Sequence, residues 1–210
     1  MTKDKICKIF DCFQKNNPYP KCELIYTNEY TFLIAIILSA QSTDKGVNKA
    51  TRELFAQIST PQDMLDLGID DLKTYIKTIG LFNNKAKSII NMSQDLVNKF
   101  NGQVPKERND LETLAGVGRK TANVFLNSIY GKPYIAVDTH VGRVSKRLKL
   151  TKEDKPLLIE KDLEQNIPNQ YKKYAGHWLV LHGRYTCKAK KPDCENCIIQ
   201  KYCPSFGKIS

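Results

Sequence analysis

The stretch LAGVGRKTANVFLNSIYGKPYIAVDTH, residues 114–140, combines a Gly-x-Gly turn, an apolar helix and a polar return segment. Gly116 and Gly118 permit a tight turn whose backbone amides point outward at the start of the following helix, and such a turn can bind a phosphate. Leu114 and Val117 beside the turn supply apolar contacts that hold two short helices together. The stretch therefore predicts a helix–hairpin–helix whose exposed turn, formed by Gly116, Val117 and Gly118, binds phosphate.

Lys120 falls in the first turn of the helix that follows this hairpin. A lysine is unexpected there, because the helix dipole disfavours a cation at the N-terminus. One interpretation is a further phosphate-binding lysine. The other is a nucleophile, since the positive helix end and Arg119 both favour the neutral amine, which is the reactive form.

Asp138 follows a short apolar run in the segment IAVDTH. Its carboxylate could cap the next predicted helix, THVGRVSKRL. A carboxylate opposite Lys120 could also take a proton from the attacking group and stabilise a developing sugar cation. These roles are compatible, so Asp138 is a candidate for both.

Apolar residues recur at helical spacing along the rest of the chain, and no set of segments alternates as strands would. Apolar stripes predict helices over residues 47–58, 72–79, 86–100 and 122–129, and Thr60-Pro61 predicts the start of a further short helix. The segment YTFLIAIILSA, residues 30–40, is ambiguous between strand and helix, and its helical neighbours favour a central buried helix. We therefore expect an all-α protein with two helical lobes, in which helices between about residues 146 and 182 pack with the N-terminal segment.

Composition limits the class of protein and of partner. The 210 residues are 41% hydrophobic and 26% charged, which is typical of a soluble globular protein. A formal net charge of +11 favours a polyanionic partner such as nucleic acid, although a solvated lysine-rich surface is the alternative. The N-terminus lacks the apolar segment of a signal peptide, and the run from Phe32 to Leu38 is too short to span a membrane, so we expect a cytoplasmic protein with no membrane partner.

Four of the seven cysteines form the pattern C-x6-C-x2-C-x5-C near the C-terminus. These are Cys187, Cys194, Cys197 and Cys203. Four thiolates held this closely predict a metal centre, and a single contiguous loop favours an iron–sulfur cluster over a zinc site with two separated hairpins.

Three lysines, Lys188, Lys190 and Lys191, occupy the first loop of this cysteine pattern. Cations beside a rigid centre are predicted to contact phosphate, and a solvated face is the alternative interpretation.

Taken together, these motifs resemble those of the endonuclease III family, which are DNA-repair glycosylases with lyase activity in the helix–hairpin–helix superfamily. The resemblance is carried, in order, by LSAQSTD, IGLFNNKA, LAGVGRKTANV, AVDTHVGRVSKRL, HWLVLHGRYTC and the four-cysteine tail. It implies a six-helix barrel domain over residues 22–132. It also implies a helical domain from residues 1–21 and 133–210 that carries a [4Fe–4S] cluster on the four cysteines.

The resemblance further implies base excision repair. Such an enzyme removes oxidised pyrimidines from double-stranded DNA and nicks the abasic site by β-elimination through a lysine Schiff base. The family's catalytic residues match Lys120 and Asp138, and the residues that fill the gap left by a flipped-out base match Gln41 and Leu81. His140 is a candidate contact to phosphate or lesion, or a structural residue near the helix cap. We expect a monomer associated with the nucleoid.

Several alternatives stay open on sequence. The adenine-mispair glycosylase branch is disfavoured, because its members lack the catalytic lysine and carry a further C-terminal domain, whereas this chain has Lys120 and ends soon after Cys203. Branches acting on mismatched thymine or pyrimidine dimers, and a non-catalytic DNA-binding module, remain. The chain departs from the family at Ala115, where a proline is common, and this change could loosen the hairpin.

Overall fold

The computed structural model describes residues 1–208 and contains, within them, ten α-helices, one short 3-10 helix and no strand. The helices are α1 (Lys3–Asn16), α2 (Glu29–Ser39), α3 (Asp44–Gln57), α4 (Pro61–Ile76), α5 (Phe82–Phe100), α6 (Arg108–Glu112), α7 (Arg119–Tyr130), α8 (Thr139–Arg147), α9 (Pro156–Asn166) and α10 (Asn169–Tyr185), followed by the 3-10 helix η1 (Gln200–Tyr202). The all-helical prediction is confirmed. No helix of the described residues is long and apolar enough to cross a membrane.

The chain divides into two compact units. The central unit is Glu23–Tyr130, and the terminal unit joins Met1–Cys22 to Gly131–Ser210. Each unit has its own buried core, so each is described by itself.

Helix α2 is the core of the central unit, and every residue from Tyr30 to Leu38 is buried. It contacts α3, α5 and α7, which leaves no solvated face and explains why its sequence has no helical periodicity. Asn28 begins the helix with a capping box, in which its side chain accepts a hydrogen bond from the Thr31 N–H at 2.9 Å. The expected central helix is therefore present, and length and capping resolve the strand–helix ambiguity.

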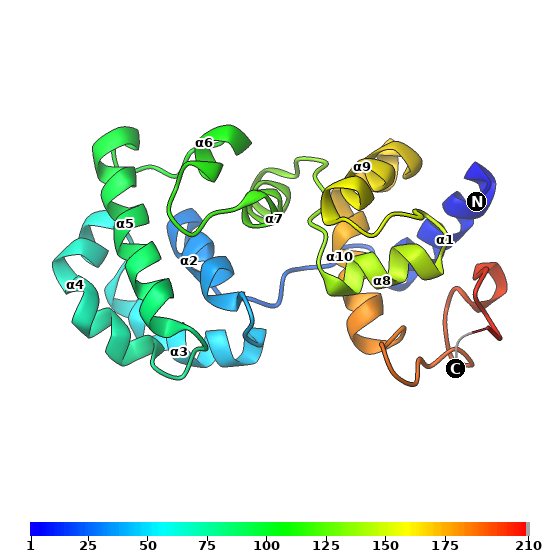
Figure 1. Ribbon diagram of the computed structural model, residues 1–210, viewed down its shortest axis with the longest axis horizontal. Helices are drawn as coiled ribbons and strands as arrows, with labels where there is room; N and C mark the ends of the chain where they lie inside the picture. Colours follow the sequence, from blue (N-terminus) through cyan, green and yellow to red (C-terminus); the bar gives the residue numbers. More distant parts are fainter. Residues whose placement is uncertain (209–210) are drawn as a thin grey trace. The chain divides into compact units, whose positions relative to one another are not determined.

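Capping side chains determine where the next two helices begin. Thr43 caps α3 and Thr60 caps α4, where Pro61 is the first helical residue. The two helical stripes expected after Thr60 lie in one helical run that is interrupted at Gly68, whose φ of 79° is left-handed. Figure 1 shows α4 beside α5, in agreement with their extensive contact.

In the terminal unit, α1 packs against α10 and α8 packs against both α9 and α10. Phe10 of α1 stacks on Tyr171 of α10 with ring centroids 5.5 Å apart. The Tyr171 hydroxyl donates to Asp11 at 2.5 Å, and the Trp178 indole N–H donates to the Asn17 carbonyl at 2.8 Å. The N-terminal segment and the helices after residue 139 thus share one core (Figure 1).

Candidate nucleic-acid interface

The hairpin between α6 and α7 presents its glycines to solvent while its apolar residues are buried. Leu114 and Val117 lie in the core, and the Val117 N–H donates to the Leu114 carbonyl at 3.1 Å to close the turn. Gly116 and Gly118 are exposed. The first amides of α7 have no intrahelical acceptor, so this turn can offer N–H groups to an anion.

The two glycines meet different structural demands. Gly116 has φ of 80°, and a Cβ there would lie 2.9 Å from the Cβ of Ser88. A side chain at position 116 is therefore disfavoured both by backbone conformation and by space. A Cβ at Gly118 would meet no atom within 4 Å, so Gly118 faces open space.

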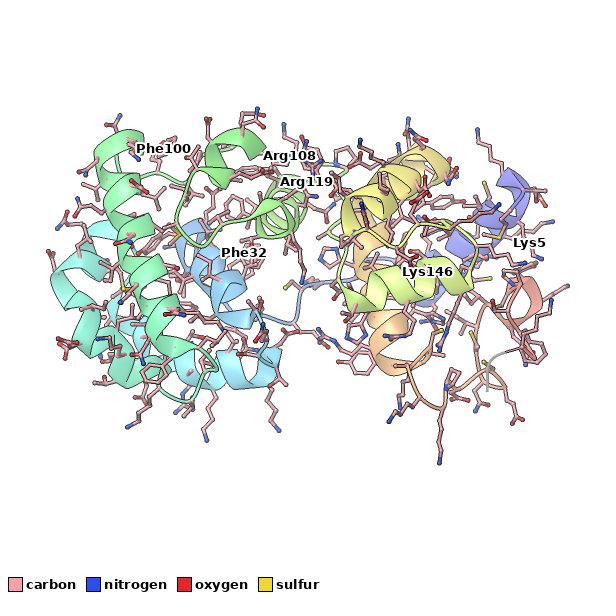
Figure 2. The ribbon with its side chains drawn as sticks, in the orientation of Figure 1. Lys5, Phe32, Phe100, Arg108, Arg119 and Lys146 are labelled. Carbon is pink, nitrogen blue, oxygen red and sulfur yellow. The ribbon has the colours of Figure 1, made fainter. Side chains whose placement is uncertain are left out.

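Polar contacts join the two hairpin helices. The Arg108 guanidinium donates to the side-chain carbonyl of the buried Asn123 at 3.4 Å, and Figure 2 shows Arg108 and Arg119 on the helices that flank the turn. Lys120 follows Arg119 in the first turn of α7 and is exposed. The amine is thus directly behind the glycine turn and open to a ligand.

Gln41 and Leu81 lie in neighbouring loops of the central unit. Both have left-handed backbone, with φ of 55° and 60° respectively, and both are exposed, Leu81 to 58%. A Cβ at Gly80 would lie 3.7 Å from the Gln41 carbonyl oxygen, so the two loops lie close together. An exposed leucine next to an exposed glutamine suits insertion into a base stack, where an apolar wedge and a hydrogen-bonding group are both useful.

Lys85 is a functional candidate that sequence reasoning missed. Its side chain is buried, and its ammonium donates to the carbonyls of Leu38 and Ala40 at 2.9 and 2.5 Å and to the Ser42 hydroxyl at 3.3 Å. Burial lowers the pKa of Lys85. The sequence feature that could have identified it is a lysine on the apolar stripe of α5, one turn before the buried Ile89.

Asp138 caps α8 in the terminal unit. The Val141 N–H donates to its Oδ1 at 2.8 Å, and the side chain is half-buried. The capping interpretation is therefore correct. The cap bond engages one carboxylate oxygen, which is compatible with a second role for the group.

His140, the next candidate, lies against α10. Its Nδ1 is 3.2 Å from Nη2 of Arg143, which also donates to the Gly183 carbonyl at 2.7 Å. A Cβ at Gly183 would lie 2.9 Å from the His140 Cβ, so the two helices approach closely at this point. These contacts favour the structural interpretation of His140.

The four predicted metal-ligating cysteines are half-buried free thiols in one loop. Burial, together with the neighbouring Cys203, Cys187 and Cys194, raises the pKa of Cys197 to about 11. Burial, Cys187 and Cys203 also raise the pKa of Cys194. Four thiolates this close to one another need a cationic centre for stability.

The donor chemistry of this loop fits an iron–sulfur cluster. Cys187, Cys194, Cys197 and Cys203 supply four thiol sulfurs from one contiguous segment. Four cysteine thiolates are the ligand set of a [4Fe–4S] cluster.

Arg147 fixes the start of the cysteine loop. Its Nη1 donates to the Lys188 carbonyl at 2.7 Å and contacts the Cys187 sulfur at 3.2 Å, while its Nη2 donates to the Ala189 carbonyl at 3.2 Å. The side chains of Lys188, Lys190 and Lys191 are exposed. The loop backbone is thus held from one side, and its three cations face solvent.

Comparison with known proteins places these features in a family. Residues 34–169 match the HhH-GPD superfamily base excision DNA repair protein family, and residues 187–203 match the iron–sulfur binding domain of endonuclease III. The chain is 54% identical over 209 residues to endonuclease III of Haemophilus influenzae, and the match covers 100% of this chain and 99% of that protein. It is 55% identical over 202 residues to endonuclease III of Rickettsia conorii, with 96% of each chain covered. A solved structure of a trapped endonuclease III–DNA covalent intermediate, an estranged-adenine complex, matches with a TM-score of 0.91 at 42% identity and covers 98% of this chain and 97% of that chain.

Proposed function

The chain belongs to the endonuclease III family of HhH-GPD base excision DNA repair proteins, and on this premise we propose which of its residues act on DNA. It is a DNA N-glycosylase and abasic-site lyase that binds double-stranded DNA and contains a [4Fe–4S] cluster. The substrate base that we propose is an oxidised pyrimidine. A panel of oxidised, deaminated, mismatched and dimerised bases in one duplex context tests this preference.

Lys120 is the proposed nucleophile. Its neutral amine attacks C1′ of the deoxyribose, and a C–N bond forms as the bond from C1′ to the damaged base breaks. The base leaves with the bonding electrons and is protonated, while Asp138 stabilises the positive charge that develops on the sugar. The exposed amine directly behind the phosphate-binding turn is the observation that supports this role.

The same lysine then accounts for strand cleavage. Transfer of a proton from nitrogen to the ring oxygen O4′ lets the C1′–O4′ bond break, and the nitrogen lone pair then forms the protonated Schiff base between Lys120 and C1′. The cationic imine makes the C2′ proton acidic, and its removal expels the 3′ phosphate oxygen, which breaks the strand. Water hydrolyses the imine and restores the free amine.

Other residues are proposed to bind and orient the duplex. The amides of Gly116, Val117 and Gly118 bind a backbone phosphate, while Gln41 and Leu81 fill the space that the extruded nucleotide leaves. Phosphate contacts are assigned to the exposed lysines Lys188, Lys190 and Lys191, whereas His140 is assigned a structural role between α8 and α10.

We propose that the four thiolates of Cys187, Cys194, Cys197 and Cys203 hold the [4Fe–4S] cluster. When bound, the cluster cross-links the loop and keeps its lysines in a fixed arrangement. The purified protein is expected to show broad visible absorption that a Cys203→Ser variant loses. A colourless wild-type protein that contains zinc would contradict the assignment.

Borohydride reduction on DNA with an abasic site tests the nucleophile. Wild-type protein and the exposed-lysine control Lys161→Gln are expected to form a covalent adduct, and Lys120→Gln is expected to form none while it keeps most of its affinity for the same duplex. Equal loss of adduct and of affinity in Lys120→Gln would show that this lysine acts only as a charge.

A further inference from the structure

We propose that Lys85 is a positioning residue that joins the loops of Gln41 and Leu81 into one DNA-inserting element. The proposal rests on the function proposed above for Gln41 and Leu81, and it assigns a role to a side chain that does not itself face DNA. It begins from one observation, a buried ammonium group whose three acceptors all lie in a different segment of the chain.

The acceptors of Lys85 surround the position of Gln41. The ammonium donates to the carbonyl of Ala40 at 2.5 Å and to the hydroxyl of Ser42 at 3.3 Å, on either side of Gln41, and to the carbonyl of Leu38 at 2.9 Å. The loop is thereby tied down at the residues before and after the one that is exposed. The Gln41 side chain remains available to a ligand.

The same lysine belongs to the element that carries Leu81. Leu81 is the N-terminal cap of α5, and its carbonyl accepts a hydrogen bond from the Lys85 backbone N–H at 3.1 Å. Lys85 therefore contacts one loop through its side chain and the other through its backbone. The two loops also lie close together, since a Cβ built at Gly80 would be 3.7 Å from the Gln41 carbonyl oxygen.

Both loops hold a backbone conformation that needs external support. Gln41 and Leu81 have φ of 55° and 60°, and non-glycine residues keep left-handed backbone only where their surroundings impose it. In addition, α2 has no basic residue in its last turn, and the ammonium of Lys85 is a cation that bonds the carbonyls of Leu38 in that turn and of the C-cap residue Ala40. One side chain thus ends the core helix and fixes the loop that leaves it.

The position explains why the residue is a lysine. Three acceptors converge on a single point within the unit, and an ammonium group has three donors on one nitrogen. A planar guanidinium directs its donors along a fork and does not suit this arrangement. An apolar side chain of the same length would remove the ammonium donor from the carbonyls of Leu38 and Ala40.

Binding measurements on two duplexes test the proposal. One duplex carries a tetrahydrofuran abasic analogue, and the other is undamaged and otherwise identical. Lys85→Met is expected to lose about tenfold in affinity for the analogue duplex, with less than twofold change for the undamaged duplex, because only the former is bound through the inserting loops. Lys87→Met, on the same helix but exposed, is the matched control and is expected to bind both duplexes as the wild type does.

A double-mutant cycle distinguishes positioning from mere stabilisation. In a Gln41→Ala background the additional loss from Lys85→Met is expected to disappear, since Lys85 acts through that loop. An equal loss for both duplexes, or a loss that adds fully to that of Gln41→Ala, would overturn the proposal. If Lys85→Met does not fold, Ser42→Ala decides the question: reduced discrimination at an unchanged Tm supports the proposal, and unchanged discrimination overturns it.

If Gln41 and Leu81 do not insert into DNA, the measurements give a different result from failure of the Lys85 proposal. Gln41→Ala and Leu81→Ala would then each bind the two duplexes with wild-type discrimination, whatever Lys85 does. Borohydride trapping of the Lys85 variant reports separately on Lys120.

Discussion

Replacement of Asp138 should separate a stabilising role from a chemical one. The carboxylate accepts the Val141 N–H as the cap of α8, and we propose that it also stabilises charge on the sugar. Asp138→Ala removes both the cap acceptor and the charge. Asp138→Asn keeps an acceptor oxygen for the cap and removes only the charge.

The structure gives different stability costs for the two changes. Loss of an N-terminal cap acceptor costs about 1 kcal/mol, and loss of a negative charge at the helix N-terminus costs about 0.3–1 kcal/mol. Asp138→Ala should therefore lose about 1–2 kcal/mol in all, and Asp138→Asn only the smaller part. For a chain of this size each kcal/mol corresponds to a fall in Tm of about 2–4 °C. The loss should be felt by the whole terminal unit, because α8 buries Val141 and Val144 against its core.

Thermal unfolding followed by circular dichroism measures the stability difference, and excision of an oxidised pyrimidine measures the chemistry. Both variants should lose excision by about 10²–10³-fold, the usual cost of removing one group that stabilises charge in the transition state. DNA with a preformed abasic site requires no departure of a base, so it should be cleaved with a smaller loss. Equal Tm values for the two variants would refute the capping argument, and wild-type excision by Asp138→Asn would refute the chemical one.

Three further changes test packing around the proposed interface. Gly116→Ala should destabilise the central unit by about 1–3 kcal/mol and weaken DNA binding, whereas Gly118→Ala should fold normally. Denaturant unfolding measures the stability of the two variants, and duplex binding measures their affinity for DNA. In α10, Gly183→Ala should lower the free energy of unfolding by about 1–3 kcal/mol, because the new Cβ clashes with α8. Gly176→Ala, where a Cβ makes ordinary contact, should raise it by about 0.5–1 kcal/mol. The two variants should therefore change Tm in opposite directions, and a raised Tm for Gly183→Ala would contradict the close approach of the helices. Ala115→Pro should stabilise the hairpin by about 0.4–1 kcal/mol by restricting the unfolded chain, and a lower Tm would show that the turn does not accept proline.

The sequence predicts those helices whose boundaries are set by local chemistry. Thr60 caps α4 where expected, because a cap depends on residues within one turn of it. The two expected stripes after Thr60 form one run broken at Gly68, a difference that depends on the left-handed backbone of a single glycine. Gly116 and Gly118 look equivalent in the sequence, but only Gly116 lies against Ser88, a contact set by α5 packing beneath the turn.

Lys85 shows what a local pattern leaves out. Sequence periodicity places it on the buried side of α5, beside residues of the core, and goes no further. Its partners lie at the end of α2, and only the packing of α5 against α2 brings them within hydrogen-bond distance. A buried cation is stable only with such partners, so its function depends on tertiary structure that no short motif encodes.

Lys120 and Asp138 each lie at the N-terminal end of a helix, and the helix dipole distinguishes them. Asp138 is favoured there, because a negative charge and a cap acceptor both stabilise α8. Stability therefore accounts for Asp138 without reference to catalysis, and only the Asn and Ala variants together can reveal a second role. Lys120 is disfavoured by about 0.3–1 kcal/mol at the start of α7, and among residues 1–208 it has neither an ion pair nor a hydrogen bond that would offset this cost. Helix stability therefore does not explain a lysine at this position, and borohydride trapping decides between the proposed nucleophile and a phosphate contact.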